Sequence, residues 1–338
     1  MMRKEWSVAV VGATGLVGGE MLRVLEERRF PMRELKALAS PRSAGKRVSC
    51  GDREVVVEAI SAQAFEGVDI ALFSAGGSAS KEWAPKAAAA GALVIDNSSA
   101  WRMDPEVPLC VPEVNLDAAR KPAKGIIANP NCSTIQMVVA LKPLHDAARI
   151  RRIVVATYQA ISGAGARAME AFAAQMRDPS QPSELLGGHL AGNLLMQWKP
   201  DAQSGYSAEV LKMMHETPKI LGDPEIAVSP TAVRVPVMTG HSEAITLETE
   251  RPLSPEEARS LLQNAPGVVV VDDFAQHVYP QPLQAAGSDP VYVGRIRRDV
   301  GNPKGLQLWV VSDNLRKGAA LNAVQIAEGL FAGEQSSP

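Results

Sequence analysis

Near its N-terminus the chain reads Ser7-Val8-Ala9-Val10-Val11-Gly12-Ala13-Thr14-Gly15-Leu16-Val17-Gly18, and this stretch decides the fold. Its first five residues form a short apolar run, which is typical of a buried strand in a parallel sheet. The glycines come next, followed by an amphipathic pattern to about residue 28 that predicts a helix. Such a turn brings phosphate groups close to the backbone and to the first amides of the helix. The spacing is G-x-x-G-x-x-G and not G-x-G-x-x-G, so a plain strand-to-helix turn is the alternative to a dinucleotide site.

The rest of the N-terminal half alternates strand-like and helix-like segments. Apolar runs at residues 35–39, 69–73, 92–96 and 125–128 predict further strands, and the alanine-rich segment 81–90 predicts a helix. Strands that alternate with helices indicate an α/β fold with a doubly wound parallel sheet.

The segment after the second predicted strand bears on which dinucleotide would bind. It reads Ala39-Ser40-Pro41-Arg42-Ser43-Ala44-Gly45-Lys46 and contains no acidic residue. An Asp or Glu at this place binds the 2′-hydroxyl of NAD, whereas the 2′-phosphate of NADP needs a cation and hydroxyl donors. Arg42 can bind a phosphate in bidentate fashion, and both serines can donate to it. NADP is therefore favoured, with an exposed polar loop as the alternative.

The tetrapeptide Asn129-Pro130-Asn131-Cys132 precedes a second helix-like run, residues 133–141. A cysteine at the start of a helix faces unpaired amides and the positive end of the helix dipole. This environment lowers the pKa of a thiol and makes it nucleophilic, and the same amides can stabilise an oxyanion. A small buried core cysteine is the alternative.

The second half predicts a mixed sheet and a returning helix. Strand-like runs lie at residues 152–159, 232–237, 242–248, 291–297 and 306–311, and a helix is expected at 167–176. Ser254-Pro255-Glu256-Glu257 is a capped helix start. Residues 313–330 predict a last helix that packs on the first domain, and residues 177–204 predict irregular connections.

His241 follows a glycine between two strands, where its ring can be presented to a ligand. A histidine in a surface turn is the alternative, and this remains the interpretation of the other four histidines.

Composition excludes several classes of protein. With 338 residues, 46% of them hydrophobic, the chain can bury a large core and is expected to form two domains. A net charge of −2 gives no electrostatic reason to expect nucleic acid or an anionic membrane as partner. The three cysteines are too scattered for a disulfide framework and form no CxxC pair, so we expect no metal site and a reducing cytoplasm. The apolar run within residues 1–11 is too short for a signal peptide. No apolar run in the sequence approaches the roughly 18 residues of a membrane span.

Short segments in a fixed order relate the chain to one family. They are GATGLVG, SAGGSAS, DNSSAWRM, VPEVN, NPNCSTIQ, TYQAISGAG, HETPKI, VRVPVMTGHSE and DNLRKGAALNAVQIAE. Together they show that the chain resembles aspartate-semialdehyde dehydrogenases over essentially its whole length. The resemblance implies a Rossmann-type NADP-binding domain over residues 1–131, completed by a C-terminal helix over 315–338, and an α/β catalytic and dimerisation domain over 132–314. It also implies a homodimer that converts L-4-aspartyl phosphate to L-aspartate 4-semialdehyde with NADPH, on the route to lysine, threonine, methionine and isoleucine.

The resemblance also implies roles for individual residues. Cys132 would be the nucleophile and His241 the acid/base, while Gln159 would orient the thioester and the substrate. Arg234 would bind the substrate α-carboxylate and Glu216 its α-ammonium. The phosphate would be bound by Arg102, Asn131, Lys219 and Ser99. NADP would be held by Gly12, Ala13, Thr14, Gly15, Leu16, Val17, Ser40, Arg42, Ser43, Ser162, Gly163 and Asn314. The chain departs from the family pattern at Pro218, between Glu216 and Lys219, and matches it only loosely over 187–197.

These roles agree with the chemistry of the residue types. A thiolate attacks an acyl phosphate and leaves a thioester, and an imidazole that titrates near neutral pH suits the later proton transfers. An N-acetylglutamyl-phosphate reductase would run the same chemistry, but its neutral amide would have little use for Glu216. A non-catalytic NADP-binding paralogue is the other alternative, and the joint presence of Cys132, Gln159 and His241 argues against it.

Overall fold

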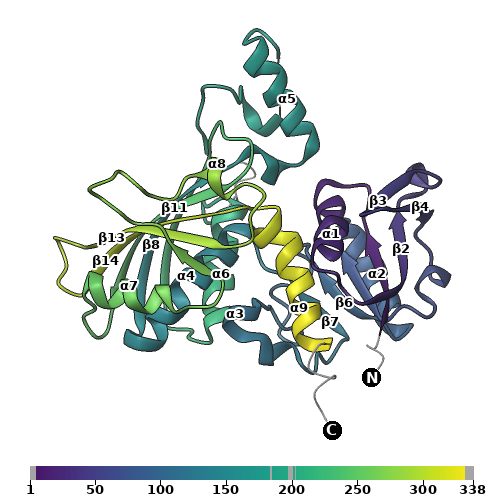
Figure 1. Cartoon of the computed structure of the whole chain (residues 1–338), viewed down its shortest axis with the longest axis horizontal. Helices are drawn as coiled ribbons and strands as arrows, with labels where there is room; N and C mark the ends of the chain where they lie inside the picture. Colours follow the sequence, from purple (N-terminus) through teal and green to yellow (C-terminus); the bar gives the residue numbers. More distant parts are fainter. Residues whose placement is uncertain (1–4, 183–184, 197–200, 202, 332–338) are drawn as a thin grey trace. The chain divides into compact units, whose positions relative to one another are not determined.

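The computed structural model describes residues 5–182, 185–196, 201 and 203–331, and the chain forms two compact units (Figure 1). The described part of the first unit comprises residues 5–130 and 319–331. The second unit is formed by the intervening part of the sequence, residues 131–318. Both units combine helices with a β-sheet, so the predicted α/β class is confirmed.

The first unit contains a sheet with the strand order β3-β4-β2-β1-β5-β6-β7. All neighbouring strands are parallel except β3 and β4. Without β3, the remaining strands follow the Rossmann order 3-2-1-4-5-6, in which the chain reverses direction beside the first strand. The strands are β1 (Trp6–Val11), β2 (Met32–Ala39), β3 (Arg47–Cys50), β4 (Arg53–Ala59), β5 (Ile70–Phe73), β6 (Leu93–Asp96) and β7 (Ile126–Ala128). The doubly wound parallel sheet is therefore confirmed, and the β3–β4 hairpin adds to it.

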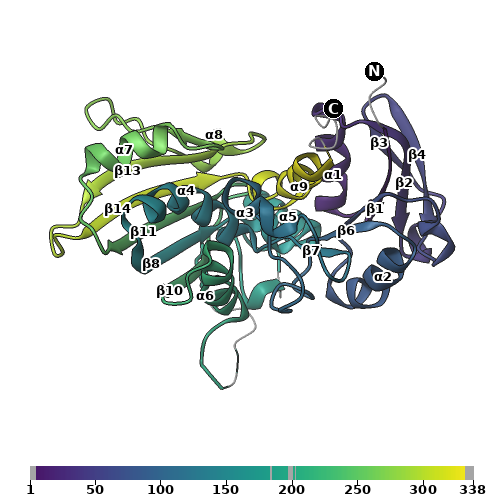
Figure 2. The same cartoon turned by 90° about the horizontal axis from the view of Figure 1, so that it is seen from below.

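The helices of the first unit include one from the far end of the chain. They are α1 (Leu16–Glu27), α2 (Gly77–Ala89), α3 (Pro112–Asn115) and α9 (Leu321–Phe331), with short 3-10 turns η1 (Pro41–Ser43), η2 (Gln63–Phe65) and η3 (Leu116–Ala119). Helix α9 lies beside α1 in both views (Figures 1 and 2), where Arg28 pairs with Glu328 at 2.7 Å. The aromatic rings of Trp6 and Phe331 meet edge to face, 4.5 Å apart. The predicted return of a C-terminal helix to the first domain is confirmed.

The second unit is built on a mixed sheet with the order β12-β13-β14-β11-β8-β10-β9. Its strands are β8 (Ile150–Gln159), β9 (Leu195–Met196), β10 (Ala227–Arg234), β11 (His241–Thr249), β12 (Val268–Val270), β13 (Val291–Arg298) and β14 (Gly305–Ser312). Helices α4 (Cys132–Ala148), α6 (Ala208–Leu221) and α7 (Pro255–Gln263) cover one face of this sheet (Figure 1). The other helical segments are η4 (Ile161–Ala164), α5 (Ala166–Arg177), η5 (Leu185–Gly187) and α8 (Pro282–Ala285).

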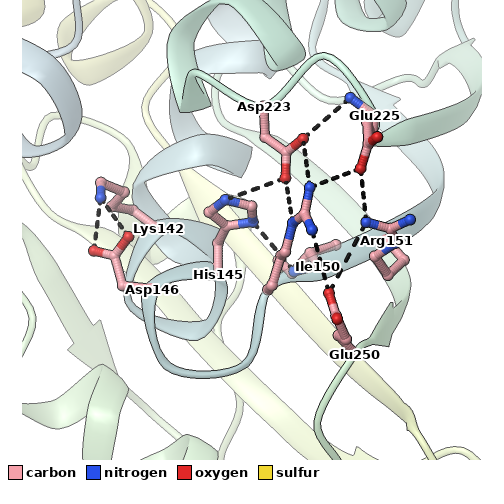
Figure 3. Close-up of polar contacts among 9 residues, drawn as sticks. Lys142, His145, Asp146, Ile150, Arg151, Asp223, Glu225 and Glu250 are labelled. Carbon is pink, nitrogen blue, oxygen red and sulfur yellow. Dashed lines mark hydrogen bonds and ion pairs between the residues drawn. The ribbon is translucent and has the colours of Figure 1, made fainter.

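One residue, Arg149, connects the end of α4 to the start of β8. Arg149, with φ +46°, lies between the two elements, and its guanidinium donates to Asp223 at 2.9 Å and to Glu225 at 2.7 Å. Figure 3 labels these two acceptors, with His145 and Ile150 beside them. Nδ1 of His145 accepts from the backbone N–H of Ile150 at 3.1 Å. These contacts fix the direction in which β8 leaves α4, and β8 carries Gln159 at its far end.

Three predicted boundaries differ from the structure. The strand predicted at 232–237 is β10, which begins at Ala227 and ends before Pro236. The helix predicted from residue 313 starts at Arg316 with a π-helical turn, η6 (Arg316–Ala320). The side chain of Asp313 accepts from the amides of residues 315 and 316, just before and at the start of this turn. Of the C-terminal helix expected over 315–338, residues 332–338 lie outside the described residues, as do residues 1–4 of the signal-like start. The irregular segment 177–204 contains η5 and β9, and residues 183–184, 197–200 and 202 lie outside the description. Within the described residues, no helix combines the length and apolar character needed to cross a bilayer.

Candidate active site

Strand ends of the second unit meet at one edge of its sheet, beside the first turn of α4. Gln159 ends β8 and Arg234 ends β10, and the two are direct neighbours in the parallel register. His241 begins β11, which runs antiparallel to β8 with Ser242 opposite Tyr158. The register therefore places His241 on the other side of Gln159 from Arg234. Three predicted residues from distant parts of the sequence lie side by side.

Cys132 is the first residue of α4, at the predicted helix start. Oδ1 of Asn131 caps this helix by accepting from the amides of Ser133 at 3.0 Å and Thr134 at 3.2 Å. The thiol is half-buried, whereas Cys50 and Cys110 are buried. Sγ lies 3.3 Å from Nε2 of His241, so a thiol and an imidazole, the predicted nucleophile and acid/base, are in contact at the start of the helix.

The ring of His241 has one tautomer open to it in this arrangement. Its Nδ1 accepts from the backbone N–H of Ala160 at 3.0 Å, and a backbone N–H can only donate. In the neutral ring the proton is therefore on Nε2, the nitrogen that faces the sulfur of Cys132. Complete burial, followed by the nearby positive charge of Arg234, lowers the pKa of His241 to about 3. The ring is neutral at physiological pH, with its single proton directed at the thiol.

Arg234 and a glycine complete the surroundings of the ring. Nη1 of Arg234 donates to the carbonyl of Ala160 at 2.5 Å. Burial lowers the pKa of Arg234 from its usual range, which leaves a guanidinium positively charged at neutral pH. A Cβ added at Gly163 would lie 3.0 Å from Nη1 of Arg234 and 3.2 Å from the His241 ring. Glycine leaves room for both side chains, since an added Cβ would require them to shift by a few tenths of an ångström.

Helix α6 brings two more predicted residues to the same region. Oε2 of Glu216 accepts from the backbone N–H of Asn131 at 2.7 Å, so this carboxylate lies against the start of α4. Lys219 follows three residues later, on the same side of the helix. The helix continues through Pro218, so the departure from the family pattern does not interrupt the element that carries both residues.

Two residues predicted to hold the cofactor contact each other near His241. Nδ2 of Asn314 donates to Oγ of Ser162 at 2.9 Å, and Oδ1 of Asn314 accepts from the amide of Gly240 at 2.9 Å. Because Gly240 precedes His241 and Ser162 precedes Gly163, these bonds join the two loops that border the histidine ring.

The sequence reasoning missed Glu209. Its Oε1 accepts from Nδ2 of Asn131 at 2.7 Å and from Nε2 of Gln159 at 2.9 Å, and its Oε2 accepts from Nζ of Lys212 at 2.9 Å. Burial raises the pKa of Glu209, but Lys212 and the hydrogen bonds outweigh burial and hold it at about 2. The available signal was spacing: Glu209 lies seven residues before Glu216, which puts both acids on one face of the same helix.

Glu243 was also missed. It lies two residues after His241 on the same face of β11, and it is completely buried. Neither carboxyl oxygen has a hydrogen-bond partner among the residues described. Burial raises the pKa of Glu243 well above its ordinary value, and the nearby side chain of Gln136 lowers it to a smaller extent.

The glycine loop of the first unit has the geometry of a phosphate cradle. Gly12 has φ +86°, and an added Cβ would lie 2.4 Å from the carbonyl oxygen of Ser74. A Cβ at Gly18 would lie 2.1 Å from the carbonyl oxygen of Gly12. Helix α1 starts after Gly15 with no side-chain cap, which leaves its first amides to a ligand. Ala13 is buried, Thr14 is exposed, and Leu16 and Val17 are half-buried in the first turn of α1.

The loop after β2 lies against this cradle. Oγ1 of Thr14 is 3.5 Å from Oγ of Ser43, while Ser40 and Arg42 are exposed beside them. The chain's cationic loop and its glycine loop therefore come together at the carboxyl edge of the first sheet, where ligands of this fold bind.

The remaining predicted phosphate residues also belong to the first unit. Arg102 is 7% exposed and donates from Nε to the carbonyl of Asn129 at 2.9 Å and from Nη2 to the carbonyl of Asn97 at 3.0 Å. Its guanidinium is thereby fixed against the strand end that precedes Asn131. Ser99 is exposed. In the described part of the chain, no three side chains of His, Cys, Asp or Glu are grouped to hold a metal ion.

Comparison with known families gives matches over most of the chain. Residues 7–121 match the family described as semialdehyde dehydrogenase, NAD binding domain, and residues 141–317 match semialdehyde dehydrogenase, dimerisation domain. The aspartate-semialdehyde dehydrogenase of Aquifex aeolicus is 56% identical over 330 residues, which cover 96% of this chain and 97% of the relative. That of Legionella pneumophila is 52% identical and covers 97% of this chain and 96% of its own.

Solved structures give the same picture. Aspartate semialdehyde dehydrogenase II of Vibrio cholerae, in complex with ASA, superposes with a TM-score of 0.94 at 45% identity, over 99% of this chain and 100% of its own. The enzyme of Candida albicans with NADP superposes with a TM-score of 0.75 at 27% identity, over 98% of this chain and 99% of its own.

Proposed function

The chain belongs to the aspartate-semialdehyde dehydrogenase family, and we propose that it makes L-aspartate 4-semialdehyde from L-4-aspartyl phosphate with NADPH. The observation that carries the proposal is the contact between Sγ of Cys132 and Nε2 of His241, 3.3 Å apart at the start of α4. A thiolate at this place is stabilised by the amides of the helix and by the dipole.

Cys132 attacks the acyl carbon of the substrate, and the tetrahedral adduct expels phosphate to leave a thioester on the sulfur. The amides of Ser133 and Thr134 are engaged by the cap from Asn131, so we propose that the dipole of α4 and the Nε2–H group of His241 stabilise the negative charge that develops on the acyl oxygen. Arg102, Asn131 and Lys219, with Ser99, are the groups we propose for the departing phosphate, because a dianion requires cations and N–H donors.

His241 is the group we propose as acid/base in the later steps. In the neutral ring Nδ1 accepts from the amide of Ala160, so the Nε2–H group donates a hydrogen bond to negative charge on the sulfur or the acyl oxygen. A complete proton transfer from Nε2 requires the imidazolium, because a neutral imidazole that lost this proton would become an imidazolate. Arg234 and Glu216 are the groups we propose for the α-carboxylate and the α-ammonium of the substrate, and Gln159 for orienting it.

We propose that the nicotinamide cofactor is NADP. The cradle at Gly12 and Gly18 and the uncapped start of α1 fit a pyrophosphate, and Arg42 with its neighbouring serines fits a 2′-phosphate. When bound, the cofactor supplies the hydride that reduces the acyl group. Ser162, Gly163 and Asn314 are proposed to hold its other end. Arg42→Ala is expected to weaken binding of NADP more than that of NAD.

We propose a homodimer of the catalytic and dimerisation domain, residues 132–314, with a first domain of residues 1–131 completed by the C-terminal helix from residue 315. The face of β8 opposite α4 supports an interface, because Val154 and Tyr158 are 40% and 38% exposed on it. The ring of Tyr158 lies 5.4 Å from that of Trp309 on the neighbouring part of this face. Light scattering of purified protein gives the mass that tests this.

A paired-substrate assay tests the activity. Purified protein is given NADP and phosphate with either aspartate semialdehyde or N-acetylglutamate semialdehyde, and NADPH is followed by its near-ultraviolet absorbance. Reduction with the first substrate is expected. No reduction with either would contradict the enzyme proposal, and a preference for the second would identify the N-acylated substrate instead.

A further inference from the structure

Glu209 lies in the first turn of α6, and its carboxylate holds two side-chain amides of the candidate active site. One oxygen, Oε1, accepts from both Asn131 and Gln159, at 2.7 and 2.9 Å. The other, Oε2, accepts from Lys212 at 2.9 Å. The Glu209 side chain is 9% exposed, so water does not replace these partners.

An ionised carboxylate only accepts hydrogen bonds. With its pKa held at about 2, Glu209 is ionised at neutral pH. The end of each amide that faces it must therefore be the NH2 end. The orientation of Asn131 and of Gln159 thus follows from the acceptor that Oε1 of Glu209 presents to both side chains.

The orientation of Asn131 matters to the helix that carries Cys132. With Nδ2 turned to Glu209, Oδ1 is left to accept from the amides of Ser133 and Thr134. An amide turned the other way would direct its NH2 group at two N–H donors. The cap of the catalytic helix would then be lost.

The orientation of Gln159 decides what this side chain offers a ligand. Its Nε2 donates to Glu209 and, at 2.8 Å, to Oγ of Ser133, so both of its protons are engaged. Its Oε1 is buried and has no partner among the described residues. Gln159 therefore presents an acceptor, which suits an N–H or ammonium donor and does not suit an oxyanion.

We propose that Glu209 is a positioning residue: its Oε1 fixes the amides of Asn131 and Gln159, so that α4 stays capped at Cys132 and Gln159 offers an acceptor to the substrate. This inference rests on the function proposed above, because a change in turnover is interpreted as a change in that reaction. Nothing else in the contacts of Glu209 requires a carboxylate, since any neutral acceptor could receive the two amides.

Two substitutions separate the acceptor from the charge. Glu209→Met keeps the length of the side chain and removes the acceptor, so kcat/KM is expected to fall about 10- to 100-fold because buried donors lose their partner. Glu209→Gln removes the charge and keeps an oxygen for both amides, while the half-exposed Lys212 can turn to water. Its kcat/KM is expected to stay within about fivefold of wild type.

A second readout does not depend on turnover. Alkylation of Cys132 by iodoacetamide at neutral pH, followed by mass spectrometry, reports the reactivity of the thiol. It is expected to slow at least about threefold in Glu209→Met, because the helix cap is lost, and to change little in Glu209→Gln. If wild type reduces no NADP in the paired-substrate assay, the proposed function fails, and this comparison still tests Glu209.

Asp272 provides the matched control. Its side chain is 5% exposed, it pairs with the half-exposed Arg259 at 2.7 Å, and it accepts from the amides of Arg295 and Ile296. Asp272→Leu is expected to lower the melting temperature and to keep kcat/KM of the folded protein within about threefold.

Two results support the proposal: a low kcat/KM for Glu209→Met with near-normal activity for Glu209→Gln, and slowed alkylation in the first variant alone. Three results would overturn it. Glu209→Met could behave as wild type in both readouts. Glu209→Gln could fall as far as Glu209→Met, which would assign the role to the charge. Asp272→Leu could lose as much kcat/KM as Glu209→Met, which would assign the loss to general destabilisation.

Discussion

The proton affinity of His241 gives the sharpest prediction. Its Nδ1 accepts from the amide of Ala160 at 3.0 Å, so a proton on that nitrogen would break the bond and set two N–H groups against each other. Burial, with the charge of Arg234, lowers the pKa of His241 to about 3, against 6.5 for an ordinary histidine. The folded protein should therefore keep this ring neutral at acidities where the unfolded chain charges it.

The size and the sign of the effect follow from linkage. Between pH 6.5 and 3 the unfolded state binds a proton that the folded state refuses, so stability decreases as the pH falls through this window. The difference between the two pKa values corresponds to about 5 kcal/mol at most, at 1.36 kcal/mol per unit. At pH 5 the contribution is about 2 kcal/mol. Glu209, whose folded pKa is also lowered, loses its stabilising effect only below its unfolded value of 4.5. Glu243, with a raised pKa, and His145, with a lowered one, also contribute between pH 7 and pH 5, so the contribution of His241 is isolated by comparison with a variant that lacks only this ring.

His241→Asn is the variant for the measurement, because the amide oxygen can accept from Ala160 and cannot titrate. The free energy of unfolding in urea is measured for both proteins at pH 7 and at pH 5. Between these two values it is expected to decrease by about 2 kcal/mol more in wild type than in the variant. In 15N-histidine-labelled wild type, Nδ1 of His241 is expected to keep the chemical shift of an unprotonated nitrogen down to pH 5. Equal losses in the two proteins, or a ring that titrates near pH 6.5, would refute the reasoning.

Three further substitutions test other parts of the site. Cys132→Ala should abolish turnover and leave NADP binding intact, measured by kinetics and by quenching of protein fluorescence; a nearly unchanged rate would make the cysteine structural. Gly163→Ala places a Cβ 3.0 Å from Nη1 of Arg234 and 3.2 Å from the His241 ring. Its kcat/KM should therefore fall at least about tenfold, with little change in melting temperature. Normal kinetics would show that both side chains can move aside. Glu243→Gln should be neutral near pH 5 and increasingly stabilising toward pH 8 in thermal melts, because the raised folded pKa of Glu243 makes wild type lose stability as the pH rises above 4.5; parallel melting curves for the two proteins would mean that Glu243 is ionised in the fold.

The sequence predicted the first unit well because its signals are local. A continuous apolar run marks each buried parallel strand, and positive φ at Gly12 is a property of the residue type. The β3–β4 hairpin escaped prediction because its strands lie at the edge and carry charged, exposed side chains that give no clear period. The start of β10 was missed because Pro230 lies within it. A proline is tolerated there because β9 pairs only with Val233 and Arg234, which leaves Pro230 on an open edge.

In the second unit the sequence identified residue types and missed their interactions. The roles of Cys132 and His241 remain predictions, but the order of segments singled out both positions, and the structure places them in contact. Glu209 gave no such signal, since a glutamate in an amphipathic helix is usually on the solvated face. The role of Glu209 depends on the side chains that it contacts, and these come from β8 and from the start of α4. Contacts between elements distant in sequence are set by the sheet register, which no local pattern reports.

The state of the catalytic pair follows from the same contacts. A thiolate beside an imidazolium needs both ring nitrogens protonated, and the amide of Ala160 occupies one of them. The pair is therefore a sulfur that faces a neutral imidazole N–H, and the positive charge near the sulfur comes from Arg234 and from the amides of α4. Neither of these loses its charge when a proton moves during the reaction. Because this stabilising charge does not depend on a proton of His241, the sulfur keeps its electrostatic support while the Nε2–H group of the neutral ring donates a hydrogen bond to the sulfur or to the acyl oxygen.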